Sequence, residues 1–481
     1  MKKVKLNFLY NTAYQILIII TPLITAPYIA RIFGATIYGN ASYSNSVLNI
    51  FNLFAAYGIM TFGQKQIARY QDDERNTKES FWSIMYLKLF LTLVVISAFT
   101  IYYLFFANPL YKSYYIMSSS VLFATLTDIS WLFMGLEKFS YTFWRNFFVR
   151  LFFVGMVFVV IQEKGDVFKY IFLMYLGNTL GNLALWFRAL KFVGKPKRIK
   201  ILKIKEYFLE ATWLFLPTIA ITVYLTIDQV ILGYLTSKKE VGYFVQADSI
   251  VRILSTLVTS LGTVLMPRIA NLFQKNKMEQ IDSIVKRSYD VMLYISIPIT
   301  LVMIFVGQRF VIFFYGVSFY NSGMVLIIEI LTIPVVVISN VIGIQYLVPL
   351  NRTKEFSMST MFGAVANIMI LPVLAVLMKS SGAALALLIT ELIVTGMQLY
   401  FVKNTINIWI FLKQDRSVYS GIILMLFVLI LSVISIRIPN DFAFIVMVST
   451  VAVSTYFFTT LYLKNSTAIL VINTLKGVFK K

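Results

Sequence analysis

Long apolar runs constrain the fold of this chain more than any other feature. A helix needs about 20 apolar residues to cross roughly 30 Å of hydrocarbon, and about fourteen segments of the sequence meet that length. The expected spans are residues 8–33, 39–63, 80–106, 113–135, 141–161, 168–190, 207–233, 241–266, 285–306, 322–350, 357–378, 382–402, 421–438 and 442–463. The sequence therefore predicts an all-α polytopic membrane protein, with helices as its only spanning elements.

The composition agrees with a membrane protein and excludes several kinds of chemistry. Of the 481 residues, 59% are hydrophobic and only 13% are charged, and the mean hydropathy is +0.79. These shares lie far from those of soluble domains. The chain has 0 Cys and 0 His. This excludes thiol nucleophiles, disulfides, the usual zinc sites and imidazole bases, and we expect no cofactor.

The basic residues indicate an orientation in the membrane. The chain has 43 Lys and Arg against 21 Asp and Glu, a balance that in a soluble protein would suggest nucleic acid. Here they gather in alternate loops, at residues 2–5, 65–78, 191–205, 275–287 and 476–481. Because positive loops tend to stay in the cytoplasm, we expect a bacterial cell-membrane protein with both termini cytoplasmic. The partner of the basic loops is then anionic lipid and not nucleic acid.

A short internal repeat suggests two related halves. Tyr38-Gly39 opens the second expected span and Gly242-Tyr243 opens the eighth, six spans later. Two six-helix lobes that enter the membrane in the same direction would follow, with a cleft between them. The expected division is 1–190 for the N-terminal lobe, 191–206 for a basic cytoplasmic linker, 207–403 for the C-terminal lobe, and 404–481 for two further helices and a basic tail.

Polar side chains form a stripe along one face of the second span. Ser42, Asn45, Asn49 and Asn52 recur at three- and four-residue spacing, so they share a helical face. Hydrogen bonds between helices would explain any one of them. Several together favour a water-filled cavity, in which Asn45 and Asn49 would contact a substrate.

Ionisable residues inside spans are costly, so each one suggests a function. Arg31, Arg150 and Arg252 lie within expected spans, and a guanidinium can bind a phosphate through two hydrogen bonds. Asp248 lies four residues before Arg252, so the two could instead form an ion pair within the helix. Lys88 and Arg145 lie near the expected cytoplasmic surface, where long side chains can reach water, and we assign them no role.

Carboxylates within spans are candidates for an ion-coupling site. Without histidine, any relay of H+ or binding of Na+ would depend on these acids, each of which could equally form an internal ion pair. The candidates are Asp128, Asp228, Asp248, Glu329 and Glu391.

Several short motifs occur in order along the sequence. These are residues 27–34 (PYIARIFG), 128–137 (DISWLFMGLE), 241–243 (VGY) and 345–349 (QYLVP), together with Gly363-Ala364 and Gly382-Ala383. In these motifs the chain resembles the Wzx-type polysaccharide flippases, within the exporter superfamily that also includes multidrug extruders and the lipid II flippase.

The resemblance implies a fold and an activity. The fold would be a MATE-like bundle of two six-helix lobes plus two C-terminal helices. The activity would be translocation of an undecaprenyl-diphosphate-linked oligosaccharide from the inner to the outer leaflet by alternating access, for capsule or exopolysaccharide assembly. A cationic cavity would receive the diphosphate, and Arg31, Arg150 and Arg252 are the positions that we assign to it. Other membrane proteins of polysaccharide assembly are potential partners.

Three other classes of function stay open from the sequence, one of which is a structural scaffold for a polysaccharide assembly complex. A different cargo in the same fold would make the chain a lipid II flippase or a multidrug extruder. A membrane glycosyltransferase or polymerase is disfavoured, because the longest outer connection, residues 307–321, is short and mostly apolar. The chain also lacks a GxxxxGK[ST] phosphate loop. We therefore expect a transporter and not an enzyme.

Overall fold

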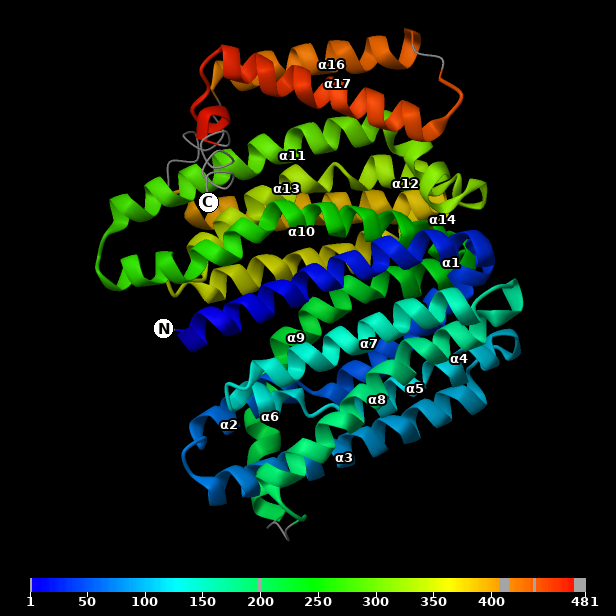
Figure 1. Cartoon of the computed structure of the whole chain (residues 1–481), viewed down its shortest axis with the longest axis vertical. Helices are drawn as coiled ribbons and strands as arrows, with labels where there is room; N and C mark the ends of the chain where they lie inside the picture. Colours follow the sequence, from blue (N-terminus) through cyan, green and yellow to red (C-terminus); the bar gives the residue numbers. More distant parts are fainter. Residues whose placement is uncertain (1, 197–200, 406–414, 436–437, 471–481) are drawn as a thin grey trace. The chain divides into compact units, whose positions relative to one another are not determined.

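The computed structural model describes residues 2–196, 201–405, 415–435 and 438–470, and these residues form helices and no strand. They fall into two compact units, Met1–Gly242 and Tyr243–Lys481 (Figure 1). Ten helical segments among the described residues are long and apolar enough to cross a membrane. The chain is thus a multi-pass, all-α membrane protein, as predicted. The number of fourteen spans and the lobe boundaries stay predictions, and the expected basic tail lies outside the described residues.

The first unit begins with a long helix that contains the first expected span and most of the second, which ends in the following helix. In α1 (Lys2–Ala56), Gly34 has φ 66° and ψ 175°, which separates the two helical stretches. Glycine adopts a positive φ without the penalty that a Cβ would bring. The following elements are α2 (Ile59–Arg69), α3 (Glu74–Phe105), η1 (Pro109–Tyr111), α4 (Lys112–Ser118), α5 (Ser120–Thr127), α6 (Ser130–Gly135), α7 (Phe139–Val160), η2 (Lys164–Asp166), α8 (Val167–Val193) and α9 (Ile201–Leu235).

Local sequence signals fix several helix starts in this unit. The side chain of Asp73 accepts a hydrogen bond from the Asn76 amide at 3.0 Å and caps α3. Glu163 and Asp166 form a capping box before α8. An aromatic core lies under α2, α3, α6, α8 and α9, where the Phe81 ring stacks on Trp131 with centroids 5.2 Å apart. This core packs together the helices whose residues form the candidate functional site.

The two glycines of the internal repeat meet in this unit. The first turns of α10 (Lys238–Gln274) cross α1 so closely that a Cβ on Gly39 would lie 1.8 Å from the carbonyl oxygen of Lys238. A Cβ on Gly242 would lie 2.3 Å from the carbonyl oxygen of Ala35. Both positions therefore need glycine because the two backbones are in contact.

The second unit contains the rest of α10 and the helices after it. These are α11 (Met278–Tyr315), η3 (Val317–Phe319), α12 (Ser322–Glu329), α13 (Thr332–Asn340), the π-helix η4 (Val341–Leu347), α14 (Thr353–Val402), α16 (Arg416–Ser435) and α17 (Asp441–Tyr462). Lys379 has φ 55° and interrupts α14, which contains two of the expected spans. Helix α11 extends past its expected end at Val306 to Tyr315, so the outer connection after it is shorter than expected.

The C-terminal helices α16 and α17 lie beside each other and pack on α11 (Figure 1). The Tyr294 hydroxyl of α11 lies 2.6 Å from that of Thr460 on α17. At the other end of α11, the Arg309 guanidinium donates to the carbonyl oxygen of Ile438 at 2.9 Å and lies over the Phe444 ring. These contacts hold α17 and the connection before it against α11.

Candidate functional site

The helix of the fourth expected span, residues 113–135, is interrupted after Thr127. Helix α5 ends at Thr127, Asp128 is extended with ψ 114°, and α6 begins at Ser130. The carboxylate oxygen Oδ1 of Asp128 accepts from the Ser130 amide at 2.8 Å and from the Ser130 hydroxyl. Such a local turn competes with the helix for its own hydrogen bonds. The expected span lies within a segment, Pro109–Gly135, that is long and apolar enough to cross a membrane, and the Asp-Ile-Ser turn interrupts its helix.

Side chains from α3 and α8 bind the carbonyl groups that the break releases. The last carbonyls of a helix have no partner within it. Asn182 donates to the carbonyl oxygen of Ala124 at 2.8 Å, and the Trp186 ring donates to that of Thr127 at 2.9 Å. The Lys88 ammonium donates to the carbonyl oxygen of Asp128 at 2.5 Å. Irregular backbone at membrane depth is tolerated when it is satisfied in this way.

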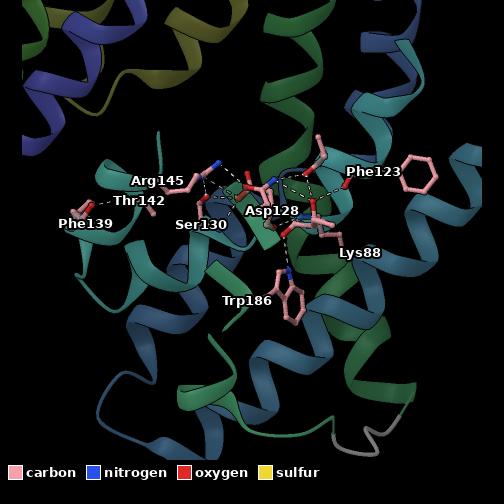
Figure 2. Close-up of polar contacts among 11 residues, drawn as sticks. Lys88, Phe123, Asp128, Ser130, Phe139, Thr142, Arg145 and Trp186 are labelled. Atoms are coloured by element: carbon pink, nitrogen blue, oxygen red, sulfur yellow. Dashed lines mark hydrogen bonds and ion pairs between the residues drawn. The ribbon is translucent and has the colours of Figure 1, made fainter. Parts of the chain in front are cut away.

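Arg145 on α7 joins the break to α8. Its Nη1 donates to Asn182 Oδ1 at 2.8 Å, and its Nη2 donates to the Ser130 hydroxyl. Nη2 also lies 3.8 Å from Asp128 Oδ1. Figure 2 shows Arg145, Ser130 and Asp128 in one network, with Lys88 and Trp186 approaching from other helices. We call Lys88, Asp128, Ser130, Arg145, Asn182 and Trp186 the break cluster.

The break cluster contains two cations and one carboxylate. Lys88 is 3% exposed, and the side chains of Arg145 and Asp128 are 11% and 36% exposed. The interpretation that Lys88 and Arg145 reach the aqueous surface is wrong. The Asp128 carbonyl oxygen binds Lys88 inside the unit, and Asn182 and Ser130 bind Arg145 there, with Asp128 nearby. Two cations near the C-terminal end of α5 also suit the negative end of the helix dipole.

The three predicted arginines lie elsewhere in the two units. Arg31 on α1 is exposed and Arg150 on α7 is partly buried. Arg252 on α10 forms the predicted pair with Asp248, with its Nε 2.6 Å and 2.7 Å from the two carboxylate oxygens. The Arg252 side chain is still 42% exposed. Arg145, one turn before Arg150, is the arginine of α7 that joins the network.

The remaining candidate acids differ in burial and pairing. Asp248 has 7% side-chain exposure in its pair. Asp228 on α9 is 3% exposed and Glu329 in the last turn of α12 is 1% exposed, while Glu391 on α14 is partly buried. Among the described residues, no group of three or more His, Cys, Asp or Glu side chains could hold a metal ion.

The polar stripe of α1 faces other helices of the first unit. Asn45 accepts a hydrogen bond from the Tyr175 hydroxyl of α8, and Asn52 accepts one from Thr125 of α5 at 2.6 Å. Asn49 is partly buried. At two of these positions the structure shows the hydrogen bonds between helices that polar residues provide in bundles. A role of Asn45 and Asn49 in substrate contact stays a prediction.

The sequence reasoning missed Lys88, Arg145 and Trp186. The available signal was the Asp-x-Ser turn at residues 128–130 inside an apolar segment, which predicts a break and therefore a need for donors. Which helices supply those donors depends on packing between segments far apart in the sequence, and the sequence does not state that packing.

Residues 4–273, more than half of the chain, match the model of the family described as polysaccharide biosynthesis protein. The chain belongs to this family. A member in Escherichia coli (strain K12) that carries the name O-antigen transporter is 26% identical over 407 residues, which are 83% of this chain and 96% of the relative. An O-antigen transporter of Shigella dysenteriae is 21% identical over 84% of this chain and all of the relative.

Solved structures show the fold of this family member. The lipid II flippase MurJ in an inward closed conformation superposes with a TM-score of 0.73 at 18% identity, over 95% of this chain and 98% of MurJ. An inward-facing multidrug transporter of the MATE family gives 0.62 at 13% identity, over 80% and 94% of the two chains. The predicted MATE-like fold is confirmed, and the relatives are transporters rather than enzymes, as predicted.

Proposed function

We propose that this chain is a flippase that moves an undecaprenyl-diphosphate-linked oligosaccharide from the inner to the outer leaflet of the bacterial cell membrane by alternating access. The observation that carries the proposal is the similarity to two O-antigen transporters along nearly their whole length. The family match and the MurJ-like fold support it. The cargo would serve capsule or exopolysaccharide assembly, where other membrane proteins of that process would receive it.

The chemistry of such a cargo suits the polar groups of this chain. A sugar diphosphate is charged and hydrated, and it cannot enter hydrocarbon unless other polar groups replace its water. Arginine binds phosphate oxygens in a fixed fork. Arg31 is exposed on α1 and Arg252 keeps 42% exposure on α10, so both side chains are accessible to a head group. With Arg150 they are our proposed diphosphate ligands, and Asn45 and Asn49 our proposed sugar ligands.

A transport step of this kind needs no covalent chemistry by the protein. The driving energy would come from an H+ or Na+ gradient or from removal of the cargo outside. The candidate acids for such coupling are Asp128, Asp228, Asp248, Glu329 and Glu391. The side chain of Asp128 is 36% exposed and that of Asp248 is 7% exposed. Both termini would lie in the cytoplasm.

The test is the fate of the cargo when the gene is deleted from its own bacterium. Undecaprenyl-linked oligosaccharide should accumulate, and glycosidase should remove its sugars in inside-out vesicles but not in right-side-out vesicles. Expression of the wild-type chain from a plasmid should reverse the accumulation. Normal surface polysaccharide and no accumulation in the deletion strain would contradict the proposal.

A further inference from the structure

Two cations of the first unit lie on aromatic rings where helices α7 and α8 meet. These helices pack against each other (Figure 1). The Arg188 guanidinium of α8 lies 4.7 Å from the centroid of the Tyr141 ring of α7. The Lys138 ammonium, just before α7, lies 3.7 Å from the centroid of the Phe192 ring of α8. Each cation therefore lies on a ring of the other helix. We call Lys138 and Arg188 the cation pair.

A buried ring joins the two contacts. Phe133 of α6 belongs to the aromatic core of this unit and is fully buried. Its ring centroid lies 5.3 Å from that of Tyr141 and 6.2 Å from that of Phe192. The core thus fixes the rings on which the cation pair lies. Side chains that are already ordered lose less entropy when they bind a ligand.

The cation pair keeps its hydrogen-bond donors available. Within the described residues, neither Lys138 nor Arg188 forms an ion pair or donates a hydrogen bond. An aromatic ring attracts a cation without taking up its N–H groups in conventional hydrogen bonds. In contrast, Lys203 of α9 lies over the Tyr207 ring and also donates to Glu79 at 2.9 Å. An anion that approaches the cation pair would therefore displace no carboxylate.

The cation pair lies where the apolar part of α7 begins. This helix is long and apolar enough to cross a membrane, and its first residue follows Lys138. The exposed side chains that come next on α7 are apolar, with Trp144 47% and Phe148 59% exposed. On α8, Phe187 is 77% exposed and Arg188 follows it directly. Cations in this position reach the lipid headgroups, while the apolar side chains beside them contact acyl chains.

We propose that Lys138 and Arg188 bind the phosphate of an anionic phospholipid, whose acyl chains lie along the exposed apolar side chains of α7 and α8. Charge complementarity favours this occupant, because a phosphatidylglycerol headgroup carries a negative phosphate and no cation. Phosphatidylethanolamine carries an ammonium beside its phosphate, which the two cations would repel. The site lies outside the basic loops for which the sequence predicted lipid contact. It also uses none of the residues proposed for the cargo, so this inference does not depend on the proposed function.

The experiment is native mass spectrometry of the full-length protein, titrated with dioleoylphosphatidylglycerol or dioleoylphosphatidylethanolamine. Lys138→Gln and Arg188→Gln should each weaken binding of the first phosphatidylglycerol by about fivefold, and the double variant by about thirtyfold. Binding of phosphatidylethanolamine should not change. The matched control combines Lys354→Gln and Lys403→Gln, which removes two exposed cations of the second unit, one of them over the Tyr400 ring. This control should bind phosphatidylglycerol like the wild type.

Equal affinities of the wild type and the double variant for phosphatidylglycerol would overturn the proposal, as would an equal loss in the control. If the double variant does not fold, Arg188→Gln decides, because this position is exposed: unchanged affinity in that variant overturns the proposal. Farnesyl diphosphate tests a prenyl diphosphate as the occupant. If an equal concentration of it displaces the bound phosphatidylglycerol from the wild type, the site belongs to the cargo and the proposal fails, whereas retention of the phospholipid supports it.

Discussion

The contact between Gly39 and the start of α10 allows a prediction with a magnitude. In Gly39→Ala the new Cβ would lie 1.8 Å from the carbonyl oxygen of Lys238 and 2.7 Å from its carbonyl carbon. The helices must separate until these atoms are at least 3.0 Å apart. The shift also disturbs Lys238, whose ammonium lies 3.8 Å from the Tyr43 ring centroid and donates to the carbonyl oxygen of Gly233.

Overpacking of this kind costs about 2 kcal/mol, which lowers the melting temperature of a unit of this size by about 4 to 8 °C. The assay is thermal unfolding of the purified protein in detergent. Gly155→Ala is the matched control because nothing lies within 4 Å of its new Cβ on α7, and alanine favours a helix over glycine by about 0.5 to 1 kcal/mol. The reasoning is refuted if Gly39→Ala melts as high as Gly155→Ala.

Three further predictions concern single contacts. Lys88→Met leaves the Asp128 carbonyl without its donor and should destabilise the protein by about 3 kcal/mol. The control Lys191→Met, at an exposed position, should cause no change. Equal melting curves for the two variants would contradict this prediction. Lys169 and the amides of Gln162 and Glu163 lower the pKa of Asp166 to about 2. The Asp166 carboxylate should therefore protect these two amides from hydrogen exchange above pH of about 4, the usual carboxyl range. This protection should be lost as the pH falls toward about 2. Asp166→Asn should abolish that pH dependence. Arg309→Ala removes the hydrogen bond to Ile438 and should lower the free energy of unfolding by about 1 kcal/mol. Amide hydrogen exchange at residues 438–444 should become faster, and unchanged exchange there would mean that this bond adds no stability.

The sequence predicted the general fold because membrane spans leave a strong local signal. Apolar length predicted membrane-spanning helices, of which the described residues contain ten candidates. The glycines at 39 and 242 were visible as a repeat. The contact between these two glycines was not predicted, because the small residues are the only sequence signal of a close helix crossing and they do not identify the partner helix. The Asp248 and Arg252 pair was predicted because spacing along one helix determines it.

The break cluster was harder to predict since its members lie on four helices and in the turn between α5 and α6. From the sequence, Lys88 was placed near the membrane surface. Only the position of the break after α5 shows that the Lys88 ammonium reaches the carbonyl oxygen of Asp128. Arg145 and Arg150 lie on the same helix, and the contacts of α7 with α8 decide which of them meets Asn182. Such choices depend on tertiary packing rather than on local pattern.

The most direct measurement is transport by the purified protein in sealed vesicles that contain undecaprenyl-diphosphate-linked N-acetylglucosamine in both leaflets. A galactosyltransferase added outside labels only the outer leaflet, so in protein-free vesicles the inner share stays unlabelled. With the wild-type protein the whole pool should become labelled. Continued protection of the inner share, in vesicles shown to hold folded protein, would contradict the account.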